Sequence, residues 1–117
     1  MQVLIACQDR YLSNTLASLV SGAGLLAIRT AQIDRVKNEL KQPDRCVIID
    51  MAWVEVQRPG MLKQLVNIGK ITSNQVICIC PNEEEDLKVM ARLAGPAKVF
   101  IRFDINTPVF KEFLKTL

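Results

Sequence analysis

A short apolar run, Cys46-Val47-Ile48-Ile49, is followed directly by the carboxylate of Asp50. Pro43 and Asp44 stand before this run. A short apolar segment between polar or turn residues is typical of a strand that is buried on both faces of a parallel sheet. Similar runs predict four further strands, at residues 3–7, 25–28, 76–80 and 99–101.

Between these runs the apolar residues recur with the period of a helix. Leu12, Leu16 and Leu19 lie at positions i, i+4 and i+7, and similar stripes occupy residues 33–40, 62–66, 87–94 and 110–117. Strands that alternate with helices predict an α/β fold with a doubly wound parallel sheet. We expect the flavodoxin-like strand order 2-1-3-4-5, in one domain that covers residues 1–117.

Capping residues predict where two of the helices begin and end. Asn82 precedes the acidic residues 83–86, which predicts a helix that Asn82 caps and that Gly95 ends. Thr107 followed by Pro108 predicts the start of the last helix, because proline suits the first helical position.

The composition excludes several classes of function. The chain has no histidine, which excludes His-based acid–base catalysis and most transition-metal sites. A net charge of +3 without a basic, aromatic-rich run argues against nucleic acid, and no apolar run approaches the roughly 18 residues of a membrane span. The four cysteines form no CxxC pair, so we expect reduced thiols. These features predict a cytoplasmic protein that has no cofactor. We expect it to bind neither nucleic acid nor a membrane.

The residues just after each predicted strand form the candidate site, because ligands gather at the carboxyl edge of doubly wound sheets. Asp50 ends a central strand, where it is either bonded to loop amides or a reactive carboxylate. The residues that follow the other strands complete the predicted pocket: Cys7, Gln8, Asp9, Cys80 and Arg102.

Over essentially its whole length, the sequence resembles the CheY-like receiver domain of two-component response regulators. Residues 43–50 resemble that family's third strand, which would make Asp50 the phospho-accepting aspartate. Residues 75–80, 82–95 and 99–102 resemble the fourth strand, fourth helix and fifth strand. The resemblance implies phosphoryl transfer to Asp50, assisted by Mg²⁺ on two acidic residues, by a Thr or Ser after the fourth strand, and by a Lys after the fifth.

The supporting positions depart from the family pattern. Cys7 and Gln8 stand where the acidic pair is expected, and Asp9 comes one place late. Cys80 replaces the hydroxyl residue, and Arg102 replaces the lysine. We therefore expect the phosphorylation apparatus to be degraded.

The charges at these positions leave two arrangements for Asp50. A hard Mg²⁺ ion would find few anionic oxygens, unless the loop turned Asp9 inward to form a weak site with Asp50. The arrangement that we expect instead is a bidentate hydrogen bond from Arg102 to Asp50, since a guanidinium suits a carboxylate.

Other side chains have two interpretations each. Cys80 is expected to be a small buried hydrophobe, and the alternative is a thiol that Arg102 activates. Trp53, the only tryptophan, is expected to pack in the core or over the pocket rather than to dock a partner. Basic residues of the last two helices and the fifth strand form either a solvated face or a partner surface: Lys88, Arg92, Lys98 and Lys111.

The leading interpretation is a pseudo-receiver, which acts in phosphorelay-type signal transduction by binding proteins and is not an enzyme. The alternative is a functional, Mg²⁺-dependent phospho-acceptor that catalyses its own phosphorylation on Asp50. A small flavodoxin-like ligand binder is disfavoured, because Gln8-Asp9-Arg10-Tyr11 lacks the Gly or Ser/Thr residues of a phosphate loop. The expected partners are signalling proteins, and a homodimer is left open.

Overall fold

The computed structural model describes residues 1–117 and has a five-stranded parallel sheet in the order β2-β1-β3-β4-β5. This confirms the predicted fold class and strand order. The strands are β1 (Gln2–Ala6), β2 (Leu26–Thr30), β3 (Arg45–Asp50), β4 (Gln75–Cys80) and β5 (Lys98–Ile101). The helices are α1 (Arg10–Gly22), α2 (Ile33–Leu40), α3 (Met61–Thr72), α4 (Glu85–Ala94) and α5 (Pro108–Lys115), with short 3-10 helices η1 (Val54–Gln57) and η2 (Arg102–Asn106).

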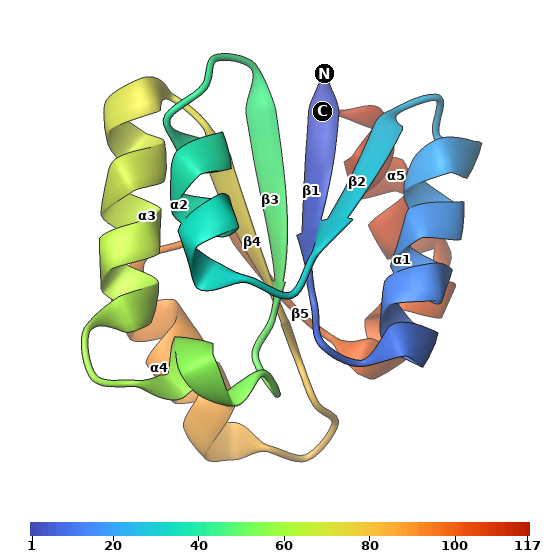
Figure 1. Cartoon of the computed structure of the whole chain (residues 1–117). Coiled ribbons are helices and arrows are strands. Elements are labelled where there is room, and N and C mark those ends of the chain that lie inside the picture. The colour runs from blue at the N-terminus through green and yellow to red at the C-terminus, as the bar shows by residue number, and fades with distance from the viewer.

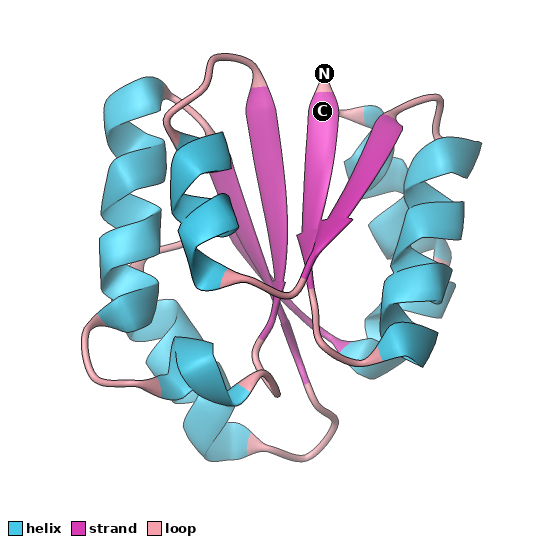
Figure 2. Cartoon of the chain, in the orientation of Figure 1, coloured by secondary structure: helices cyan, strands magenta, loops and turns pink.

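Helices cover both faces of the sheet, as Figures 1 and 2 show. Helices α1 and α5 lie on one face, and α2, α3 and α4 lie on the other. The central strands are apolar on both faces because their alternate residues enter two different cores. Along β3, Val47 and Ile49 pack with α2 and α3, whereas Cys46 and Ile48 pack with α1 and α5.

The edge strand β2 differs from the buried strand that its apolar run predicts. It begins at Leu26, and the Leu26 side chain is 57% exposed. Strand β2 pairs only with β1, so one of its edges has no neighbouring strand. An edge position buries less of a strand than a central one, which explains the difference.

The capping predictions had different outcomes. Gly95 follows α4 with a φ of +76°, the left-handed conformation that suits glycine, and Pro108 is the first residue of α5, as predicted. The prediction that Asn82 caps α4 was wrong, because α4 begins at Glu85. The Asn82 Oδ1 atom instead accepts a hydrogen bond from the Phe103 backbone N–H, at 2.9 Å, and so ties the loop after β4 to η2.

A buried asparagine, Asn74, joins three segments at the edge of the sheet where β3 and β4 begin. The Nδ2 group of Asn74 donates to the carbonyls of Leu40 (2.8 Å) and Gln42 (2.7 Å), and its Oδ1 accepts from the Arg45 N–H (2.9 Å). Asn74 therefore joins the end of α2, the start of β3 and the α3–β4 turn. None of the helices is both long enough and apolar enough to span a membrane.

Candidate functional site

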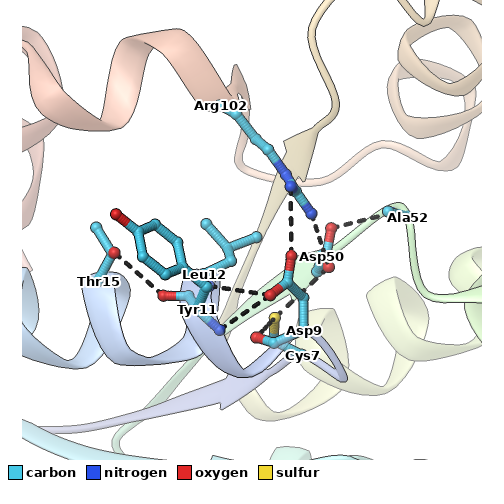
Figure 3. A network of polar contacts seen from close by, with 8 residues as sticks. All are labelled: Cys7, Asp9, Tyr11, Leu12, Thr15, Asp50, Ala52 and Arg102. Atoms are coloured by element: carbon cyan, nitrogen blue, oxygen red, sulfur yellow. Dashed lines mark hydrogen bonds and ion pairs between the residues drawn. The ribbon is translucent and has the colours of Figure 1, made fainter.

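The carboxyl edge of the sheet brings Asp9, Asp50 and Arg102 together (Figure 3). Asp50 is the last residue of β3, Asp9 precedes α1, and Arg102 directly follows β5. Three of the predicted pocket residues, which are far apart in the sequence, therefore meet at one point.

Asp50 is almost fully buried, with 2% of its surface exposed. Its Oδ1 atom accepts a hydrogen bond from the Ala52 N–H at 3.0 Å. Its Oδ2 atom lies 3.4 Å from a terminal guanidinium nitrogen of Arg102 and 3.5 Å from the Cys7 thiol. The carboxylate therefore bonds a loop amide, as the first of its two interpretations predicts, and it also contacts a charged neighbour. Its reactivity stays a prediction.

Asp9 also faces Arg102, while it caps α1. Its Oδ1 atom accepts from the Tyr11 and Leu12 backbone N–H groups at 2.9 and 3.3 Å, as an N-cap residue does. Its Oδ2 atom lies 3.5 Å from the second terminal nitrogen of Arg102. The loop has thus turned Asp9 towards the guanidinium.

Arg102 bridges two carboxylates rather than gripping one. The predicted pairing with Asp50 is confirmed, but its bidentate form was wrong, because each terminal nitrogen goes to a different carboxylate. The Nε atom of Arg102 is buried without a hydrogen-bond partner, so the terminal nitrogens make all of these contacts. One permanent positive charge is therefore shared between two negative charges.

A cavity of about 270 Å³ opens beside this bridge. It is lined by Gln8, Asp9, Asp50, Ala52, Trp53 and Arg102. Trp53 is only 2% exposed and packs in the core on the α2–α4 face, which confirms its predicted packing role. Ala52 was missed, although the amide two residues after an aspartate is a common partner of that side chain.

The cysteines do not gather at the cavity as a pair. The Cys7 thiol contacts Asp50, but neither Cys7 nor Cys80 lines the cavity. Cys80 packs with Cys78 in the core that α2, α3 and α4 cover. The alternation along β4 places Cys80 on the same face as Cys78. Burial raises the pKa of Cys80, and the charges that oppose this rise are those of Lys88 and Arg92, not that of Arg102, so the predicted activation by Arg102 finds no support here.

The donor set does not fit the Mg²⁺ ion that the resemblance to receiver domains implies. Asp9 and Asp50 both contact the guanidinium, and the Cys7 thiol also contacts Asp50. Burial and the Asp50 charge raise the pKa of Cys7 to about 12, so this soft ligand also remains protonated. The chain contains no group of three Cys, Asp or Glu side chains that is arranged to hold a metal ion. A hard dication would have to displace Arg102.

The four basic residues predicted as a partner surface lie on three elements. Lys88 and Arg92 are on α4, Lys98 begins β5, and Lys111 is on α5. Lys88 is half-buried and forms an ion pair with Glu85 at 2.9 Å, whereas the other three are exposed. The α4 and α5 members lie on helices that cover opposite faces of the sheet.

Replacing Arg102 by alanine is expected to lower the free energy of unfolding by about 1–3 kcal/mol, because Asp50 then keeps a buried charge without its cation. Chemical denaturation of both proteins measures this change. The exposed Arg10, which forms no ion pair, gives the matched control Arg10→Ala, with an expected change within about 0.5 kcal/mol.

The same substitution in an Asp50→Asn background is expected to cost less, since the unpaired charge is gone. An equal cost in both backgrounds would show that Arg102 stabilises the fold by packing alone.

Neither a family model nor a curated protein matches the sequence. Several solved structures match the fold. One is a putative pilus assembly-related protein from Burkholderia pseudomallei, at a TM-score of 0.77 and 20% identity, over 99% of this chain and 87% of that chain. Another is a response regulator receiver protein from Burkholderia phymatum, at a TM-score of 0.67 and 19% identity, over 86% of this chain and 82% of that chain. A third is a response regulator from Colwellia psychrerythraea, at a TM-score of 0.60 and 18% identity, over 98% of this chain and 94% of that chain. At these identities the likeness concerns the fold alone: this chain folds as response-regulator receiver domains do.

Proposed function

We propose that this chain is a pseudo-receiver: a signalling module that acts by binding other proteins and does not depend on phosphorylation of Asp50. The observation that supports this proposal is the Arg102 guanidinium between Asp9 and Asp50. A fold hosts many functions, so the proposal depends on the site and not on the likeness.

The bridge acts against phosphoryl transfer in two ways. Phosphoryl transfer to a carboxylate needs positive charge on the transferring oxygens, which a metal ion usually provides. Here the cation already pairs with the acceptor oxygen of Asp50, so an incoming phosphoryl group would have to break that contact. Cys80, which stands at the family's hydroxyl position, is fully buried and offers no hydroxyl for the phosphoryl oxygens.

Incubation with acetyl phosphate and Mg²⁺ is expected to leave the intact mass of the protein unchanged, because the site lacks both the metal ligands and a free acceptor oxygen. Mass spectrometry of the wild type beside Asp50→Asn measures this, and a melting temperature that does not respond to Mg²⁺ with beryllofluoride would agree with it. A receiver domain that phosphorylates under the same conditions is the positive control.

The second candidate function is a working phospho-acceptor, and one observation favours it. Asp50 lines a cavity that opens to solvent, so a small phosphodonor has a path to it. An adduct of one phosphoryl group that Asp50→Asn abolishes would establish this function and overturn the pseudo-receiver proposal.

A further inference from the structure

A second concave site, away from Asp50, is lined by residues of η1, the start of α3 and α4. The start of α3 lies beside α4 in Figure 1. We call it the α3–α4 groove and define it by six of its lining residues: Val56, Arg58, Leu62, Lys63, Met90 and Leu93. Its volume is about 440 Å³, and it shares no lining residue with the Asp50 cavity.

The floor and the α4 wall of the groove are apolar. Val56 and Leu62 are buried in the core beneath it. On α4, Leu93 is 79% exposed, Met90 is 37% exposed and the neighbouring Val89 is 50% exposed. Helix α4 therefore presents several large apolar side chains to solvent, although it buries only Ala91. Apolar side chains that gather beside a groove indicate a binding surface more often than isolated ones do.

The rim of the groove has a charge of one sign. Arg58 and Lys63 are exposed, and neither forms an ion pair within the chain. No acidic side chain lines the groove. An apolar floor with an unpaired basic rim is complementary to a segment that has apolar side chains on one face and carboxylates beside them.

We propose that the α3–α4 groove binds an acidic amphipathic helix of another protein. The apolar face of that helix packs on Leu93 and Met90, and its carboxylates pair with Arg58 and Lys63. Recognition of this kind lays apolar residues at helical spacing into a groove, and the charges select the partner and its orientation. This inference rests on the proposed interaction function and deepens it by naming the chemistry of the partner.

The test begins with a displayed library of random peptides of roughly 16 residues, a length at which helices become stable enough to populate. Selection against the wild-type protein is expected to enrich peptides with apolar residues at i, i+3 or i+4 and i+7, and with net negative charge. The strongest binder is then synthesised, and its dissociation constant is measured by isothermal titration calorimetry against the wild type and the variants below.

Two variants alter the groove and two serve as controls. Leu93→Ser and Lys63→Glu are each expected to weaken binding by roughly tenfold or more. Ile71→Ser removes a more exposed apolar side chain, 85% exposed on α3, that does not line the groove, and Lys41→Glu reverses an exposed charge after α2. All four positions are exposed, so folding is expected to be retained, and circular dichroism checks it. Both controls are expected to bind as the wild type does.

Three results would overturn the inference: a selection without enrichment, enriched peptides without acidic residues, or binding that Leu93→Ser and Lys63→Glu leave unchanged. Self-association that Leu93→Ser abolishes would also overturn it, because the occupant would then be a second copy of this chain. Two separate measurements distinguish failure of this inference from failure of the proposed function: phosphorylation of the wild type, and peptide binding by Asp50→Asn. An adduct on Asp50 would overturn the pseudo-receiver proposal, whereas groove-dependent peptide binding in Asp50→Asn would still support the groove.

Discussion

Between pH 8 and pH 10 the free energy of unfolding is expected to fall by about 4 kcal/mol, because three buried thiols resist ionisation in the folded chain. Burial is the main cause that raises the pKa of Cys7, Cys46 and Cys78 from 9.0 to about 12. Between these two pKa values the unfolded chain binds fewer protons than the folded one, so stability falls as the pH rises. The stability that the protonated thiols contribute is fully present below pH 9. Above pH 9 the free energy of unfolding falls by about 1.4 kcal/mol per pH unit for each thiol, up to about pH 12.

Urea denaturation at several pH values between 7.5 and 10 measures this loss. Cys46 gives the cleanest variant, since burial is the only cause of its shift. The slope of stability against pH in Cys46→Ala is expected to be smaller by about one thiol's share. If Cys46→Ala and the wild type lost stability equally above pH 9, ionisation of this thiol would not be the cause.

Replacing Asn74 by alanine is expected to cost about 2–4 kcal/mol of stability, although Asn74 lies far from the candidate site. Asn74 is 7% exposed, and its side chain makes three hydrogen bonds to backbone groups. Alanine would leave the Arg45 N–H and the Gln42 carbonyl without these partners. The Leu40 carbonyl would keep a bond from the Thr72 hydroxyl, at 2.7 Å, which limits the cost.

Chemical denaturation of Asn74→Ala beside Asn38→Ala tests this expectation. Asn38 is exposed on α2 and makes no side-chain hydrogen bond, so its replacement is expected to change stability by less than about 0.5 kcal/mol. Equal losses in the two variants would mean that the Asn74 hydrogen bonds contribute little beyond the loss of an asparagine side chain.

The fold could be predicted from local patterns, because the strands are short apolar runs and the helices between them repeat apolar residues with a helical period. The start of α4 could not, since Asn82 caps no helix and instead bonds Phe103, which lies twenty-one residues further along the chain. At the site, the pairing of Arg102 with Asp50 followed from charge, whereas its second contact depended on where the loop places Asp9. A signal for that placement was present: Asp9 stands three residues before the apolar helical stripe that begins at Leu12, where an N-cap is expected. The α3–α4 groove had no such signal, because it joins residues 56–63 to residues 90–93 only through tertiary packing.

Trp53 has a consequence for how this molecule can be observed. It is the only tryptophan, it lines the Asp50 cavity, and η1, which directly follows it, supplies Val56 to the α3–α4 groove. The wavelength and intensity of the protein's tryptophan fluorescence therefore come from one indole. This indole lines the Asp50 cavity and directly precedes the 3-10 helix that contributes to the α3–α4 groove. A ligand in the cavity would change the polarity beside the ring directly, and a partner in the groove would act on it through one turn of 3-10 helix. The protein thus contains its own optical reporter, and no label has to be added.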